Sequence, residues 1–340
     1  MGQTAGFQSF PYEGGFMASR IKSEGTIKEV AVVGAGLMGH GIAQVFARGG
    51  CSVKLYDSNE DVLRTSKERI RSNLRLCVDA GFEDEAVVDG VLSRIETTRN
   101  LRQAVQGADF VTEAVFEDLN LKKEVFKEID AATNDHVVMA SNTSGLNISE
   151  VGKGIRKSDR LLITHWFNPP HLIPVVEVLK TEATSEKTLQ WTLSFLKEMG
   201  KEPVHILKQV PGFLVNRIQT AMFREVIGLL EAGVATAENI DRAVSGSFGL
   251  RLAAIGPLAT VDLAGVHLWF QGAKNLYPLF DASQEPQKTL AEMVERGFLG
   301  KKTGKGFFDY QAGSTKGNEE EIRDKKLLGI LGILRKYKGD

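Results

Sequence analysis

Two short stretches of this 340-residue chain contain residue types and spacings suited to chemistry. One is glycine-rich: Gly34, Gly36 and Gly39 form the pattern G-x-G-x-x-G directly after an apolar run. The first glycine permits a tight turn, the second lets a pyrophosphate approach the backbone, and the third lets a helix pack closely on a strand. The pattern predicts a dinucleotide site at a helix N-terminus, with Leu37 and Met38 in the phosphate-binding turn.

Asp57 ends the next apolar run, about 20 residues after the glycines, where an acid accepts hydrogen bonds from the adenosine ribose. A carboxylate at this position repels a 2′-phosphate, so we expect NAD rather than NADP as cofactor. The alternative is that Asp57 only caps the following helix, and both roles are compatible.

The second stretch contains the segments SNTSGL, THWFNPP and VVEV. His165 ends an apolar run, and Glu177 lies within another. Histidine is suited to the role of a general acid or base, because imidazole titrates near neutral pH. A carboxylate on the adjacent strand can hold and polarise that imidazole, as in a catalytic triad. A lone histidine at a strand end is more often structural, so the pairing with Glu177 matters.

Apolar and β-branched runs alternate with segments of helical period, which predicts βαβ units and a parallel sheet. The expected strands are 29–34, 52–57, 109–115, 137–142 and 161–165, and the expected helices are 39–49, 59–78, 121–133 and 185–199. Glu177 is expected on a further strand. The fold class is therefore α/β, a Rossmann-type doubly wound and mainly parallel sheet followed by a smaller all-helical domain.

Strand signals end near residue 208, and helical spacing follows from about residue 215. A C-terminal helix is also possible, although Gly329 and Gly332 weaken that prediction. The expected divisions are a flexible arm or leader at 1–27, the NAD-binding domain at 28–208, a helical substrate and dimerisation domain at 209–312, and a tail at 313–340.

Composition excludes several classes of protein. The chain has 42 Lys plus Arg and 43 Asp plus Glu, so we expect no nucleic-acid partner held by charge. Two cysteines exclude a disulfide scaffold and favour a reducing compartment, the cytoplasm. The His and Cys spacings predict no metal site. The apolar runs are too short for a membrane span, and the N-terminus lacks the pattern of a secretory signal.

Several motifs together resemble the L-3-hydroxyacyl-CoA dehydrogenase family, over about Val30 to Tyr310. Each motif alone is weak, whereas the ordered set is specific. In chain order they are G-x-G-x-x-G from Gly34, SNTS from Ser141, H-x-F-N-P from His165, V-E-V from Val176, PGFLVNR from Pro211, Gly256-Pro257 with Asp262, and KTGKGF from Lys302.

The resemblance implies roles for individual residues. His165 is the general base, and the general acid in reverse, with Glu177 polarising it. Ser144 and Asn216 bind and orient the substrate oxygen. Asn168 supports the histidine loop or the substrate carbonyl.

Glu113 and Lys122 match family positions near the nicotinamide ribose, although a strand-end acid and a solvated helix lysine are nearly as good an interpretation. The resemblance also implies a homodimer formed through the helical domain, and a role in fatty acid and lipid metabolism.

Two departures leave the substrate open. The family usually carries a serine and a lysine that contact CoA where this chain has Asn73 and Ala80, followed by acidic residues. The segment around Arg251 looks more like relatives that act on free hydroxy acids, such as the gulonate, carnitine and pyridine-carboxylate dehydrogenases, and Arg251 can clamp a carboxylate.

The leading hypothesis is NAD-dependent interconversion of 3-hydroxyacyl-CoA and 3-oxoacyl-CoA. The alternatives are the same chemistry on a free hydroxy acid, and a non-catalytic NAD(H)-binding protein like a lens crystallin relative. The spacing of His165 and Glu177 disfavours a 2-hydroxyacid enzyme with a catalytic lysine.

Overall fold

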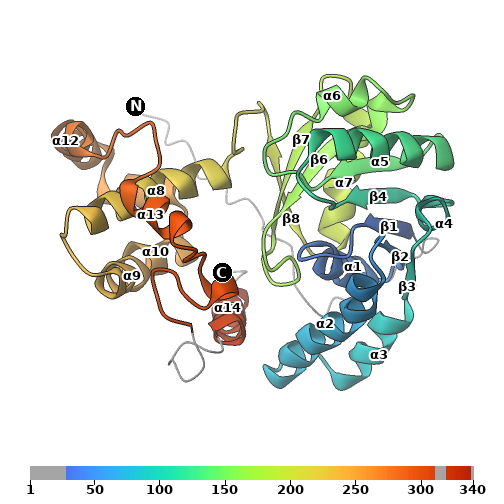
Figure 1. Ribbon diagram of the computed structural model, residues 1–340, viewed down its shortest axis with the longest axis horizontal. Coiled ribbons are helices and arrows are strands. Elements are labelled where there is room, and N and C mark those ends of the chain that lie inside the picture. Colours follow the sequence, from blue (N-terminus) through green and yellow to red (C-terminus); the bar gives the residue numbers. More distant parts are fainter. Residues whose placement is uncertain (1–27, 311–318, 338–340) are drawn as a thin grey trace, which may run out of the picture. The chain divides into compact units, whose positions relative to one another are not determined.

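The computed structural model describes residues 28–310 and 319–337, which form two compact units (Figure 1). Unit 1 comprises residues 28–214 together with 325–337, and unit 2 comprises residues 215–310 together with 319–324. The expected leader at 1–27 and the start of the expected tail lie outside the described residues.

Unit 1 is built on an eight-stranded sheet in the order β3-β2-β1-β4-β5-β6-β7-β8. All neighbours pair in parallel except β6 and β7, which are antiparallel. This confirms the predicted fold class. The strands are β1 (Glu29–Val33), β2 (Ser52–Tyr56), β3 (Ile95–Thr98), β4 (Phe110–Glu113), β5 (Val138–Ser141), β6 (Leu161–Trp166), β7 (Val175–Lys180) and β8 (Glu202–Ile206).

Helices cover both faces of this sheet (Figure 1), so the side chains of the inner strands β4, β5 and β6 are buried throughout. The helices of unit 1 are α1 (Gly39–Arg48), α2 (Glu60–Asp79), α3 (Glu85–Ser93), α4 (Leu101–Val105), α5 (Leu119–Ala132), α6 (Ser149–Gly152) and α7 (Glu186–Glu198). The last helix, α14 (Glu319–Lys336), ends in unit 1.

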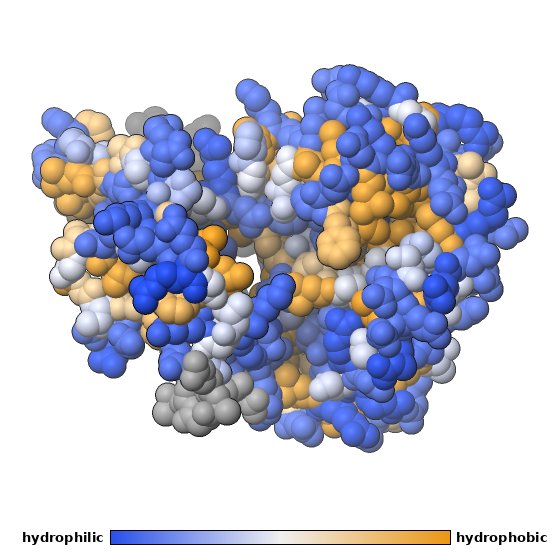
Figure 2. Space-filling view, viewed as in Figure 1, coloured by the Kyte–Doolittle hydropathy of each residue, from blue (hydrophilic) through white to orange (hydrophobic). Residues whose placement is uncertain are grey.

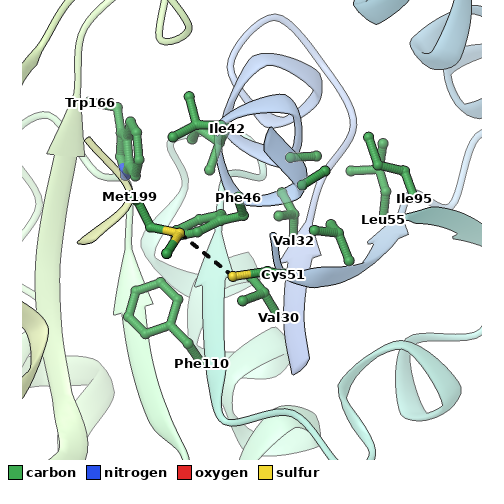
Figure 3. Close-up of a cluster of buried hydrophobic side chains, with 14 of the residues drawn as sticks. Val30, Val32, Ile42, Phe46, Cys51, Leu55, Ile95, Phe110, Trp166 and Met199 are labelled. Carbon is green, nitrogen blue, oxygen red and sulfur yellow. Dashed lines mark hydrogen bonds between the residues drawn. The ribbon is translucent and has the colours of Figure 1, made fainter. Parts of the chain in front are cut away.

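Aromatic side chains fill the core on the face covered by α1 and α7 (Figure 3). Phe46 of α1 stacks on Phe195 of α7, with ring centroids 5.6 Å apart and planes 9° from parallel. Cys51 lies among them, with its Sγ 3.6 Å from the sulfur of Met199. Burial raises the pKa of the Cys51 thiol to about 12, so this cysteine stays protonated at neutral pH.

Unit 2 is helical, as predicted. Its helices are α8 (Val215–Glu231), α9 (Ala237–Gly246), α10 (Phe248–Ala254), α11 (Pro257–Ala264), α12 (Val266–Leu276) and α13 (Lys288–Glu295). Among the described residues of unit 2, only Gln287 and Asp324 are buried, and no apolar side chain is. Figure 2 shows apolar residues at its surface among the polar ones.

No single helix in the described part of the chain has the length and apolar character of a membrane span, although the bent pair 237–254 and 257–264 together has both. The same residues contain no group of three or more His, Cys, Asp or Glu side chains suited to a metal ion.

The units divide after Leu214, six residues later than the boundary expected after 208. Phe213 has no exposed surface and packs in the core of unit 1. The backbone N–H of Leu214 donates to a carboxylate oxygen of Glu177 at 3.1 Å. Burial of Phe213 and the hydrogen bond of Leu214 therefore keep the residues up to 214 in unit 1, although the strand pattern ends before them. The C-terminal end of α14 also belongs to unit 1, rather than to a separate tail.

Candidate active site

The glycine turn after β1 has the geometry that its sequence predicts. Gly34 has φ of +105°, and a Cβ there would lie 2.6 Å from the carbonyl oxygen of Ala114. A Cβ on Gly39 would lie 1.6 Å from the carbonyl oxygen of Gly34. Neither position can hold a side chain. At Gly36, by contrast, a Cβ would meet nothing within 4 Å. The turn therefore leaves open space beside Gly36, where a ligand can approach the backbone.

The N-terminus of α1 follows that space. The side chain of Met38 makes no capping hydrogen bond, and the first turn of the helix contains no acidic residue. The first N–H groups and the positive end of the helix dipole are therefore available to an anion. Leu37 in the same turn is exposed. The turn lies beside β4, where the strand order reverses, and such switch points bind ligands in doubly wound folds. These features fit a dinucleotide pyrophosphate.

Asp57 is fixed at the edge of the same turn. One carboxylate oxygen accepts from the N–H of Ala35 at 2.9 Å, and the other accepts from the N–H of Asn59 at 2.9 Å. The cap of α2 is Asn59, which accepts from the N–H groups of Asp61 and Val62. The capping role considered for Asp57 is therefore wrong. Each of its oxygens keeps a lone pair for a ribose hydroxyl.

His165 and Glu177 face each other across β6 and β7. They are paired residues in the antiparallel register, and imidazole Nδ1 lies 2.7 Å from Glu177 Oε2. An N–H at Nδ1 donates to the carboxylate, which leaves Nε2 with its lone pair as an acceptor. This is the arrangement of a general base whose cationic form is stabilised by a carboxylate.

The surroundings of this pair are dry and rigid. Glu177 has no exposed surface, and its second oxygen accepts from Leu214 N–H. The rings of Phe167 and Phe213 meet the imidazole edge-on, with centroids 4.7 and 5.5 Å away. Coulomb attraction is stronger in such a low-dielectric setting than in water. The site therefore strengthens the attraction between the carboxylate and a positively charged ring, and it holds the ring in one orientation.

Ser144 lies in the turn after β5, next to β6 in the sheet. Its N–H and its hydroxyl both donate to Glu117 Oε1, at 2.8 and 3.2 Å. The Thr143 hydroxyl donates to the same oxygen at 2.5 Å. The other oxygen of Glu117 lies 3.4 Å from Lys122 Nζ. These hydrogen bonds lower the pKa of Glu117, although its partial burial opposes them. Glu117 thus keeps its charge and orients the Ser144 hydroxyl.

Glu113 and Lys122 form a buried ion pair with Oε1 and Nζ 2.7 Å apart. Glu113 also accepts from the N–H of Val115 and from the Ser141 hydroxyl, each at 2.7 Å, and has no exposed surface. Burial raises its pKa, partly offset by Lys122. In this arrangement the carboxylate of Glu113 therefore has no accessible oxygen for the cofactor contact that was predicted for it. The accessible carboxylate nearby is that of Glu117, which the sequence analysis missed. The one sequence feature that pointed to Glu117 is its position between the end of a strand and the next helix.

The remaining predicted residues belong to different parts of the chain. Asn168 is exposed and precedes a cis peptide bond to Pro169. Asn216 and Arg251 belong to unit 2: the former is half-buried in the first turn of α8, and the latter is exposed on α10. The geometry within unit 1 brings together the histidine, the glutamate and the turns that precede them.

Two family models match the chain. The model described as 3-hydroxyacyl-CoA dehydrogenase, NAD binding domain, matches residues 29–210, and the model of the C-terminal domain matches residues 212–310.

Two of the curated relatives have names that state different reactions. Human mitochondrial hydroxyacyl-coenzyme A dehydrogenase is 37% identical, covering 84% of this chain and 92% of its own. The 5-formyl-3-hydroxy-2-methylpyridine 4-carboxylate 5-dehydrogenase of Mesorhizobium japonicum is 34% identical, covering 91% of this chain and 98% of its own.

Two of the similar solved structures have names that state the same two reactions. A 5-formyl-3-hydroxy-2-methylpyridine 4-carboxylic acid 5-dehydrogenase matches with a TM-score of 0.84 and 32% identity, over 91% of this chain and 99% of its own. The (S)-3-hydroxybutyryl-CoA dehydrogenase of Ralstonia eutropha matches with a TM-score of 0.68 and 33% identity, over 84% of this chain and 100% of its own.

Proposed function

The chain belongs to the 3-hydroxyacyl-CoA dehydrogenase family and is an NAD-dependent oxidoreductase acting on CH–OH groups, and we propose that it interconverts an L-3-hydroxyacyl-CoA with its 3-oxo form. The observation that carries the proposal is the buried His165–Glu177 pair, with Nδ1 and Oε2 2.7 Å apart at the carboxyl end of β6. The reaction assigns the protein to fatty acid metabolism.

In the proposed oxidation, His165 Nε2 removes the proton of the substrate hydroxyl. Glu177 stabilises the imidazolium that forms, and it is itself held by Leu214 N–H. The hydride leaves the carbon that bears this hydroxyl group, and the bound nicotinamide would accept it. In the reverse direction His165 returns the proton to the oxygen. Ser144 and Asn216 orient the reacting oxygen in this proposal.

The test is oxidation of NADH, followed by absorbance, with acetoacetyl-CoA and with free acetoacetate at equal concentration. Turnover with the thioester alone supports the proposed substrate. Turnover of neither compound, followed by none with a panel of other carbonyl compounds, would contradict the assigned reaction.

A second candidate substrate is a free hydroxycarboxylic acid. Asn73, at the position where the family resemblance places a CoA-binding serine, donates instead to Gln44 Oε1 at 3.1 Å. Two nearby arginines, Arg48 and Arg71, pair with Glu83 and Asp89. CoA phosphates need cationic partners, and these two arginines are already engaged. The similarity to the pyridine-carboxylate dehydrogenase also favours this candidate. Turnover of a free acid that Arg251→Ala abolishes would support it.

We also propose that the protein is a homodimer in a reducing compartment such as the cytoplasm. Helices α10 to α12 expose large apolar side chains, among them Leu258 and Leu263, at 79% and 78%. Patches of this kind mark protein interfaces. Cys51 and Cys77 are both buried, and neither forms a disulfide. Light scattering after gel filtration gives the subunit number directly.

A further inference from the structure

Helix α14 lies beyond both family models, which end at residue 310. Leu327, Leu328 and Leu331 give it a narrow apolar face, while Gly329 and Gly332 lower its intrinsic helix propensity. A helix of this composition depends on tertiary contacts for its stability. The contacts of that face therefore indicate what the helix is for.

The apolar face of α14 packs on unit 1. Leu328 is 1% exposed and forms a buried cluster with Cys77, near the end of α2, and with Leu172. Phe82 packs against the same cluster. A Cβ on Gly332 would lie only 3.2 Å from the Phe82 ring, so glycine allows the close approach of the helix at this point. The helix thus packs closely on this surface, because Leu328 fills the cluster and Gly332 leaves room for the Phe82 ring.

Leu172 belongs to the segment 168–173, which begins three residues after His165. Lys201 holds this segment from the side of the sheet: its Nζ donates to the carbonyl oxygens of Pro170 at 2.6 Å and Ile173 at 2.9 Å. The side chain of Leu172 has no exposed surface. Two devices therefore fix the segment, a buried lysine that binds its backbone and the apolar cluster that includes α14.

The same segment carries two polar side chains, Asn168 and His171, that follow the base closely in sequence. Asn168 is exposed, and His171 Nδ1 lies 3.5 Å from the side-chain nitrogen of Asn73. Any displacement of Leu172 moves these groups relative to the strand that carries His165. Shifts of about 1 Å far from the reacting atoms can reduce turnover about a hundredfold.

We propose that α14 is a positioning element of the substrate site, which through Leu328 holds Leu172 and with it the segment 168–173. The helix does not touch substrate; it fixes the residues that do. The proposal rests on the proposed function, since it assigns this segment to the same site.

The test compares Leu328→Asp with Ile333→Asp in the full chain. The first change puts a charge into the cluster, and the second puts it on the same helix at a side chain that is 63% exposed. We expect Leu328→Asp to raise hydrogen exchange at the amides of Leu172 and Ile173 at least tenfold. We expect kcat/KM to fall about tenfold or more, and the Kd for NADH to stay within twofold. Ile333→Asp should match the wild type in all three.

Leu328→Ala serves if the aspartate variant fails to fold, with the same directions and smaller changes, and Leu328→Met should restore wild-type values. Unchanged exchange at residues 172 and 173, or unchanged kcat/KM despite faster exchange, would overturn the proposal. Exchange is measured without substrate. If the wild type turns over none of the compounds offered, the proposed function fails, while the exchange measurement still decides whether α14 holds the segment 168–173.

Discussion

The two units bury their apolar residues very differently. Unit 1 packs rings such as Phe46 and Phe110 between sheet and helices with no exposed surface, whereas in unit 2 large side chains such as Phe270 remain 65% exposed. Burial of apolar surface is the main stabilising term in folding. Unit 1 therefore contains a complete core of its own. Unit 2, taken by itself, does not, and this is the physical reason to expect a second subunit against it.

The difference extends to chemistry. The buried histidine and glutamate, and the glycine turn, all lie in unit 1, while the predicted residue Asn216 lies in unit 2, in the first turn of a helix whose residues are not buried. Rigid packing suits residues that must hold a fixed orientation during proton transfer. Substitutions of matched residues in each unit test this difference between the units.

The largest effect should come from His165→Gln in unit 1. General-base catalysis contributes about a hundredfold to ten-thousandfold, so turnover should fall by that factor. NADH binding, measured by fluorescence, should not change, because the glycine turn is untouched. Asn216→Ala in unit 2 is the paired variant and should cost less, about tenfold. Near-normal rates in His165→Gln would refute the assignment of the base.

The next largest effect should be a difference between the units in the free energy of unfolding that is lost when a phenylalanine is removed. Phe46→Ala should cost about 3–5 kcal/mol in free energy of unfolding, because it leaves a cavity in a packed core. Phe270→Ala removes an exposed ring and should cost well under this in dilute protein. Its effect should appear instead as a larger dimer Kd, measured by sedimentation. Equal losses of unfolding free energy for the two variants would mean that unit 2 has a core of its own.

Cofactor choice depends on one carboxylate of unit 1. Asp57→Ala removes the acceptor fixed by the N–H groups of Ala35 and Asn59. The ratio of kcat/KM for NAD to that for NADP should fall about tenfold, or about 1.4 kcal/mol, since a hydrogen bond to a charged group contributes about 1.5–3 kcal/mol. Asp262→Ala in unit 2 is the matched control and should leave the ratio alone. An unchanged ratio in Asp57→Ala would reject the ribose contact.

The smallest effect is a pH dependence of stability from Cys51. Burial raises its pKa to about 12, so folding favours the thiol. This contribution is complete below the unfolded pKa and is lost as pH rises toward 12; at pH 10 the loss is about 1.4 kcal/mol. Denaturation at pH 8 and pH 10 should show that loss in the wild type and less in Cys51→Ala. Equal pH dependence in both proteins would contradict the buried thiol.

Sequence alone predicted the elements with strong apolar runs. β1 and β6 are mostly apolar and almost entirely buried and were expected, whereas β3 and β8 were not. β3 buries only Ile95, and β8 has no buried residue, because both lie at sheet edges. Edge strands carry little of the periodicity on which such predictions depend.

At the site, sequence predicted residues whose types are rare in their setting, such as a histidine at a strand end. It missed Glu117, because an exposed glutamate before a helix looks like ordinary surface. Its role depends on distances to Ser144 and Lys122 that no spacing reveals.

The antiparallel step between β6 and β7 has a consequence for how the molecule assembles. The base and its carboxylate are twelve residues apart in the chain and meet through strand register. Contacts at short sequence separation form with little loss of chain entropy and favour rapid folding. Register also makes the pair vulnerable: a single inserted residue in either strand would turn one side chain to the opposite face of the sheet. The pair can therefore form early in folding as one local unit, and it can be inherited intact or lost by one small insertion.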